Sequence, residues 1–84
     1  MKAIKWHNRA RRQMKKIPAG YREAIFDSVD QLAAFPECEG LDIKPLKNHA
    51  CDYRLRVGRY RVLFNDAIEI IEIQEVKKRD ERTY

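Results

Sequence analysis

Three arginines stand at alternating positions in two neighbouring segments of the sequence. Arg54 and Arg56 alternate with apolar residues in the segment YRLRV, which begins at residue 53, and Arg61 does so in the segment YRVLF, which begins at residue 60. A guanidinium group is planar, permanently charged and able to bind phosphate oxygens through two hydrogen bonds. The chemistry that these residues could perform is therefore phosphate binding and stabilisation of negative charge on phosphate.

The alternation predicts two β-strands, over 53–57 and 60–64, joined by a tight turn at Gly58. Because successive side chains point to opposite faces of a strand, burial of the apolar residues sends all three arginines to the other face. Cross-strand neighbours lie roughly 5–8 Å apart, and neither segment contains a carboxylate. A single arginine on a strand is often only a solubilising residue, but three on one face favour an anion-binding site.

Positive charge is concentrated in three blocks of the chain. The 84 residues include 18 Lys and Arg against 13 Asp and Glu, a net charge of +5. Residues 1–17 contain seven basic residues and no acid, and residues 44–65 contain six basic residues and one acid. Residues 66–84 have a net charge of −2, but four basic residues cluster within 77–82. Residues 18–43, by contrast, contain six acids and one basic residue. This segregation favours a polyanionic partner, either nucleic acid or an acidic protein.

Length and composition exclude several classes of protein. The chain is expected to be a single domain over 1–84, and its longest apolar run, of four residues, is far shorter than the roughly 20 that a membrane helix needs. No apolar segment of the kind found in secretory signals follows the basic N-terminus. Cys38 and Cys51 form no CxxC motif and have no histidine at metal-ligand spacing. We therefore expect a reduced, cytoplasmic protein that uses no metal or cofactor and contacts no membrane.

The residues before the arginine segments predict two helices. Residues 2–5 are expected to form a short edge strand, and apolar residues three to four positions apart predict a helix over 6–17, with Trp6 packing it onto the sheet. Pro18 separates it from a second helix that runs to about Phe35. Five apolar residues form the buried stripe expected on this second helix: Tyr21, Ala24, Ile25, Val29 and Leu32.

A loop is predicted over 36–45, before the strands. Tyr53 and Tyr60 are assigned to the core by strand parity, and Asn65–Asp66 to a second turn. Residues 68–76 are predicted to form a third strand, whose alternation slips between Ile70 and Ile71, as expected for a strand that is covered on both faces or bulged. The fold class is therefore α+β: an N-terminal helical hairpin packed on a small antiparallel β-sheet in two layers, with the order β-α-α-β-β-β.

These motifs together resemble the RelE/ParE toxins of bacterial type II toxin–antitoxin systems. The resemblance rests on YRLRVGRYRVLF over 53–64 and on Leu46–Lys47 before it. It also rests on the C-terminal segment 76–84, which begins with VKKRD and ends with Tyr84. It extends over nearly the whole chain, but the hairpin motif does not separate the RelE branch from the ParE branch. It implies one of two activities: RelE-like toxins cleave messenger RNA in the ribosomal A site, whereas ParE-like toxins bind DNA gyrase.

The RelE branch of this resemblance implies a ribosome-dependent, metal-independent endoribonuclease. In such an enzyme the 2′-OH attacks the adjacent phosphate, leaving a 2′,3′-cyclic phosphate and a 5′-OH. The implied catalytic residues are Arg54, Arg56, Arg61, Arg79 and Tyr84, with Tyr84 as the proton acceptor. The expected RNA-binding residues are basic residues elsewhere in the chain: Lys47, Arg59, Lys77, Lys78, Arg9, Arg12 and Lys16.

The sequence departs from the family pattern at two of these positions. Arg54 and Arg56 stand where the family often has Lys, which keeps the charge but makes proton transfer by them unfavourable, because arginine titrates above 12. His7 and His49 are the other candidates for proton transfer, and a structural role is favoured for both. The partners implied are a cognate antitoxin, mRNA and ribosomal RNA, with the toxin monomeric alone and hetero-oligomeric with its antitoxin. A nucleic-acid-binding module without cleavage remains the third interpretation.

Overall fold

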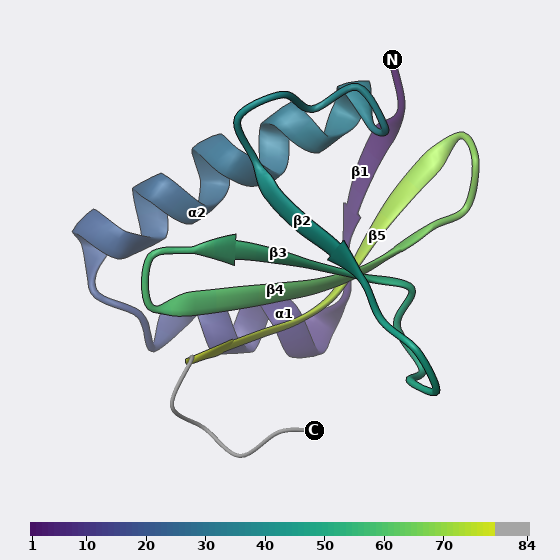
Figure 1. Ribbon diagram of the computed structural model, residues 1–84. Helices are drawn as coiled ribbons and strands as arrows, with labels where there is room; N and C mark the ends of the chain where they lie inside the picture. The colour runs from purple at the N-terminus through teal and green to yellow at the C-terminus, as the bar shows by residue number, and fades with distance from the viewer. Residues whose placement is uncertain (79–84) are drawn as a thin grey trace.

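Both helices lie on one face of a five-stranded sheet (Figure 1). In this computed structural model of the 84-residue chain, residues 1–78 are described. The elements follow one another as β1 (Ala3–Trp6), α1 (Asn8–Lys15), α2 (Ala19–Gln31), a 3₁₀ turn (Leu32–Ala34), β2 (Asp42–Pro45), β3 (Tyr53–Val57), β4 (Tyr60–Asp66) and β5 (Ile70–Lys78). Among these residues no helix is long and apolar enough to cross a membrane.

The order of the strands in the sheet is β1-β5-β4-β3-β2. Strands β2 to β5 pair with antiparallel neighbours, as expected for strands joined by short turns, and β1 pairs in parallel with β5. The predicted α+β class and helical hairpin are confirmed. The sheet is mixed rather than wholly antiparallel, because the chain passes through both helices between β1 and the rest of the sheet.

The core lies between the helices and the apolar face of the sheet. Leu55, Val62 and Phe64 are fully buried there, as strand parity predicts, and Tyr60 is 4% exposed. Tyr53 is half-buried, with its ring stacked on that of Phe64 at a centroid distance of 5.5 Å. The assignment of both tyrosines to the core side of the sheet is therefore confirmed.

Several predicted boundaries and burial assignments are wrong. Trp6 belongs to β1 and packs edge-on against Phe26 of α2 at 5.3 Å, so it does not belong to α1. Tyr21 and Ala24 of the predicted stripe are exposed. The segment 42–45, predicted as loop, forms β2, because it pairs with β3 despite its lack of apolar alternation.

The predicted turn at Asn65–Asp66 is also wrong, because both residues continue β4. The chain turns instead at 67–69, where Ile68 has φ +70°, and β5 spans 70–78 rather than 68–76. A bulge is present, but it lies further along β5 than the predicted slip. Leu63 faces Glu75 and Phe64 faces Ile73, so Gln74 is the extra residue. The bulge explains a second change of alternation, from Ile71 and Ile73 on one side of it to Val76 on the other, all of which are buried. The slip at Ile70 has another cause, because Ile70 is 38% exposed next to the turn.

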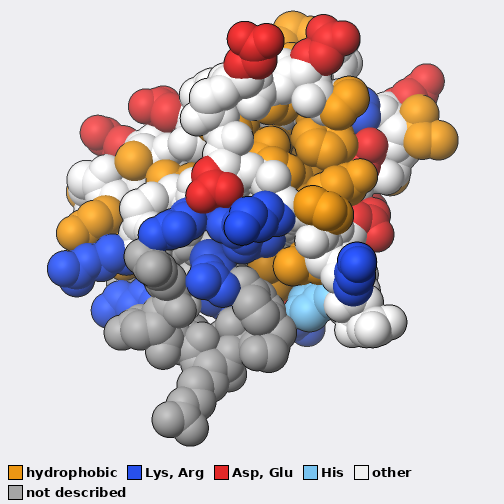
Figure 2. Space-filling model, viewed as in Figure 1, with side chains coloured by type: hydrophobic (Ala, Val, Ile, Leu, Met, Phe, Trp, Pro, Cys, Tyr) orange, Lys and Arg blue, Asp and Glu red, His pale blue; other side chains and the backbone are white. Residues whose placement is uncertain are grey.

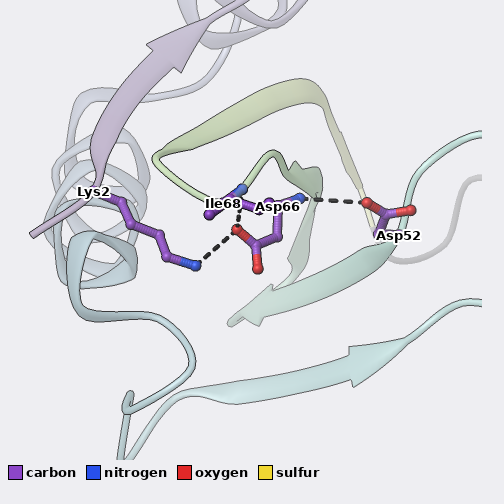
Figure 3. Close-up of polar contacts among 4 residues, drawn as sticks. All are labelled: Lys2, Asp52, Asp66 and Ile68. Atoms are coloured by element: carbon purple, nitrogen blue, oxygen red, sulfur yellow. Dashed lines mark hydrogen bonds and ion pairs between the residues drawn. The ribbon is translucent and has the colours of Figure 1, made fainter.

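A polar cluster joins Lys2, the residue before β1, to the end of β4 and the turn that follows it (Figure 3). The Asp66 carboxylate accepts hydrogen bonds from Lys2 Nζ at 2.8 Å and from the backbone N–H of Ile68 at 3.1 Å. The backbone N–H of Asp66 donates to Asp52 Oδ2 at 3.4 Å. These contacts hold the end of β4 against the segment that precedes β3.

The first helix covers the part of β5 that extends beyond β1. β1 pairs with 70–73 only, so the backbone of 74–78 has no strand on that side. There the Gln13 side chain of α1 accepts a hydrogen bond from the Val76 N–H at 2.7 Å. Helix α1 therefore brings its basic residues close to the edge of the sheet.

Candidate phosphate-binding face

Four charged side chains form one line across the open face of the sheet. Asp42 of β2 pairs with Arg56 of β3, Arg56 with Arg61 of β4, and Arg61 with Lys77 of β5. Because directly paired residues point to the same face, Arg56, Arg61 and Lys77 are side-by-side neighbours, and we call these three residues the cationic row. Figure 2 shows Lys and Arg side chains gathered over the β3–β4 hairpin, with an acidic side chain beside them. The prediction that arginines of the two segments share this face is confirmed.

Arg54 lies on the same face but in a different environment. It is 8% exposed, and its guanidinium Nη2 is 3.6 Å from Asp42 Oδ1. Its strand partners are Lys44 and the fully buried Leu63. Arg54 therefore ties the edge strand β2 to the sheet, and it presents less of its charge to solvent than the half-buried Arg56 does.

Acidic side chains reach this face from the strands that flank the hairpin. Besides Asp42, Glu75 of β5 lies opposite Leu63, and its Oε1 is 3.3 Å from Lys77 Nζ and 3.6 Å from Arg9 Nη1. The two hairpin segments lack carboxylates, as their sequence shows, but the neighbouring strands supply them. Reasoning from the sequence did not identify Glu75 or Asp42, because neither the pairing of β2 nor the position of the bulge was known.

The other predicted RNA-binding residues surround this face or lie away from it. Arg59 is exposed in the β3–β4 turn, and Lys47 is exposed in the loop after β2. Lys78 pairs with Tyr60, so it lies on the helix side of the sheet, opposite Lys77. The α1 residues assigned to RNA binding are all exposed: Arg9, Arg12 and Lys16. Arg79 and Tyr84 lie outside the described residues.

The histidines and the nearby cysteine make local contacts. His7 Nε2 is 3.2 Å from Gln74 Nε2, and His49 Nδ1 accepts a hydrogen bond from the Cys51 N–H at 2.9 Å. Burial raises the pKa of the Cys51 thiol, and the carboxylates of Glu75 and Asp52 add to that rise. These contacts agree with the structural roles favoured for both histidines. In residues 1–78, no three His, Cys, Asp or Glu side chains are grouped so that they could hold a metal ion.

A second feature lies on the helical side of the molecule. A groove of about 340 Å³ between α1 and α2 has an apolar floor formed by Trp6, Met14 and Phe26. Three basic residues complete its lining: Arg11, Lys15 and Arg22. Phe26 remains 41% exposed, so large apolar surface is open to a partner here.

Comparison with known proteins identifies the family of this fold and face. A family model described as the ParE toxin of the type II toxin–antitoxin system parDE matches residues 4–83. The chain belongs to this toxin family. It is therefore a RelE/ParE-like toxin of a type II toxin–antitoxin system. No curated protein matches the toxin in sequence.

Solved structures of RelE toxins have the same fold. The archaeal RelE–RelB complex from Pyrococcus horikoshii OT3 contains a chain that is 26% identical, with a TM-score of 0.77 and 98% of each chain covered. The toxin–antitoxin complex RelBE2 from Mycobacterium tuberculosis gives 26% identity and a TM-score of 0.76, with 93% of this chain and 98% of the other covered. The isolated RelE toxin of E. coli, at 18% identity, has a TM-score of 0.75 over 99% of this chain and 88% of its own, and shows the shared fold alone.

Proposed function

We propose that this toxin is a metal-independent endoribonuclease that cleaves messenger RNA on the ribosome and thereby stops translation. The observation that carries the proposal is the cationic row of Arg56, Arg61 and Lys77 on an open sheet face. Like charges opposite one another cost stability, and a bound phosphate offsets that cost. Two structural neighbours at 26% identity belong to RelE–RelB and RelBE2 complexes, and they support the nuclease branch of the family.

The proposed reaction is an attack of the ribose 2′-oxygen on the adjacent phosphorus. The P–O5′ bond breaks, the 2′-hydroxyl proton goes to a base, and the leaving 5′-oxygen gains a proton. Negative charge grows on the non-bridging oxygens in the transition state, and fixed cations stabilise it most when they are already in place. We assign this role to the cationic row, with Arg54 as a supporting residue because of its burial and its ion pair with Asp42.

Proton transfer is assigned from the family resemblance. Tyr84 is the proposed base and Arg79 the residue that orients the phosphate or the leaving group. Tyrosine has an ordinary pKa near 10, so the surrounding cations must lower it for Tyr84 to accept a proton near neutral pH. Six further basic residues are proposed to hold messenger or ribosomal RNA: Lys47, Arg59, Lys78, Arg9, Arg12 and Lys16.

The proposed regulator is a cognate antitoxin with acidic and amphipathic segments. Two surfaces fit such a partner: the cationic row, and the groove floored by Trp6, Met14 and Phe26 with its basic lining residues. A segment that folds on binding can wrap around a large surface and so can cover both of these regions. The RelE–RelB complexes among the neighbours support this assignment. We propose that the free toxin is monomeric, acts in the cytoplasm, and assembles with the antitoxin into a hetero-oligomer.

The alternative is a ParE-like toxin that binds DNA gyrase and has no nuclease activity. The family model that matches residues 4–83 carries the ParE description, and this observation favours the alternative. The cationic row favours the nuclease instead, because neighbouring guanidinium and ammonium groups can bind phosphate oxygens directly.

A translation extract with one defined message separates the two activities. The proposal predicts cuts within the translated region that end in a 2′,3′-cyclic phosphate, that continue in EDTA-treated toxin, and that require ribosomes. A supercoiling assay with purified gyrase runs in parallel. An intact message together with inhibited gyrase would reject the nuclease and establish the alternative.

A further inference from the structure

Glu75 places a negative charge on the sheet face that is proposed to bind phosphate. Its side chain is 16% exposed, and it lies two residues before Lys77 on the same face of β5. A single oxygen, Oε1, is within 4 Å of two cations: Lys77 Nζ at 3.3 Å and Arg9 Nη1 at 3.6 Å. The Lys77 side chain is itself only 21% exposed, so this pair is less screened by water than a pair on the open surface.

Lys77 needs such a partner more than the arginines of the row do. A lysine ammonium is a point charge at the end of a flexible stem with many rotamers, whereas a guanidinium is a rigid fork. Lys77 also pairs directly with Arg61 across β4 and β5, and the repulsion between them favours rotamers that carry the ammonium away. The contact with Glu75, at 3.3 Å on the same face of β5, opposes that movement and restricts the rotamers of Lys77.

The contact with Arg9 extends the same argument to α1. This helix lies against the part of β5 that β1 leaves uncovered, where Gln13 bonds the Val76 N–H. Arg9 projects from the first turn of the helix to Glu75, although 66% of its side chain is exposed. Glu75 therefore joins the basic surface of α1 to the cationic row.

We propose that Glu75 is a positioning residue that sets Lys77 in line with Arg56 and Arg61 for the phosphate undergoing reaction. The inference rests on the proposed nuclease function and adds a residue to its site. It predicts that loss of the Glu75 carboxylate weakens phosphate binding, which is the opposite of what net charge alone predicts. Removal of this negative charge makes the face more cationic, yet it weakens the contact of Lys77 with phosphate.

The experiment compares Glu75→Gln with Glu72→Gln, a matched control. Glu72 lies on the same strand three residues earlier, paired with Asn65 and Lys5, away from the cationic row. Both variants remove one negative charge and keep the shape of the side chain. Circular dichroism and thermal unfolding establish that each variant is folded.

The binding arm uses a 2′-O-methyl oligoribonucleotide, which cannot be cleaved, and measures its affinity against salt concentration. A lost phosphate contact lowers the slope of log K against log salt by about 0.7 for single-stranded nucleic acid. We expect this decrease for Glu75→Gln and for Lys77→Met, no further decrease in the double variant, and a slope equal to that of the wild type for Glu72→Gln. A slope for Glu75→Gln equal to that of Glu72→Gln would overturn the inference, and this result does not depend on cleavage.

The cleavage arm measures the rate at saturating toxin on programmed ribosomes. We expect Glu75→Gln to cut on the order of tenfold more slowly than wild type, because a small misplacement of a catalytic cation is costly, and Glu72→Gln to cut at the wild-type rate. Equal rates for Glu75→Gln and wild type would refute the positioning role while leaving the nuclease proposal intact. A wild-type toxin that does not cut would reject the nuclease proposal, and the salt slopes would then decide the positioning role alone.

Discussion

Arg56 and Arg61 are directly opposite each other in the antiparallel pair of β3 and β4, and both point away from the helices. Like charges at such paired positions destabilise a sheet by up to about 1 kcal/mol relative to neutral pairs. Asp42 on one side of this pair and Glu75 near the other reduce the cost without removing the positive character of the face. The relationship is typical of a surface that binds an anion.

Inorganic phosphate is expected to raise the melting temperature of the toxin. A ligand that binds only the folded state at ten times its Kd stabilises it by about 1.4 kcal/mol, which corresponds to a rise of roughly 6–11 °C for a small domain. The double variant Arg56→Gln/Lys77→Met should lose most of this rise. Lys5→Gln, which neutralises an exposed cation on the edge strand β1, should keep it. Thermal unfolding in phosphate and in chloride of equal ionic strength measures the difference, and an equal rise in all three proteins would contradict the assignment.

Ile68→Gly is expected to stabilise the protein by about 1 kcal/mol. Ile68 has φ +70° in the turn between β4 and β5, a left-handed conformation that is costly for a β-branched residue and free of strain for glycine. Its side chain is 79% exposed, so little burial is lost. Urea unfolding measures the change. Asn48→Gly is the control, because Asn48 at φ +54° already tolerates this conformation, and an equal gain there would remove the explanation by strain.

Phe64→Ala is expected to lower the free energy of unfolding by roughly 3–5 kcal/mol. The ring is fully buried, stacks on Tyr53 at 5.5 Å and meets Phe35 edge-on at 5.6 Å. Ile70→Ala, at a position that is 38% exposed, should cost much less. Urea denaturation of both variants checks the ranking, and similar losses would show that the core is placed on the wrong side of the sheet.

The stability that Cys51 contributes is expected to depend on pH. Burial raises the pKa of its thiol above the ordinary value of 9.0, and nearby carboxylates raise it further. A group with a raised pKa in the folded state stabilises that state fully below the unfolded pKa, and this contribution disappears as the pH rises through the folded pKa. The difference in unfolding free energy between wild type and Cys51→Ala should therefore shrink as the pH rises above the ordinary thiol pKa of 9.0. A constant difference would mean that the thiol ionises equally in both states.

The arginine face could be predicted from the sequence because strand parity is a local property. Once Leu55 and Val62 are buried, the directions of Arg56 and Arg61 follow, and Gly58 between the segments sets the turn that pairs them. The helical hairpin was predictable for a similar reason. Ala10, Met14, Ile25, Val29 and Leu32 recur at helical spacing and are buried.

The carboxylates of the site could not be predicted, because they depend on non-local pairing. Asp42 is in a segment with no apolar alternation, and it becomes a strand only because β3 offers it a partner. Glu75 reaches the open face because the bulge at Gln74 shifts the parity of β5, so a strict alternation from Ile71 would assign Glu75 to the core side. A single extra residue thus determines that Glu75 lies beside Lys77.

The most direct test of the central claim is the rate of messenger cleavage by Arg61→Ala on programmed ribosomes, with Lys5→Ala as the control for lost charge. If the cationic row stabilises the transition state, Arg61→Ala should cut about 100-fold or more slowly while remaining folded, and Lys5→Ala should cut at nearly the wild-type rate. Product ends from the residual cleavage should still carry a 2′,3′-cyclic phosphate. Equal cleavage by Arg61→Ala and wild type, or a wild-type toxin that leaves the message intact while inhibiting gyrase, would contradict the account.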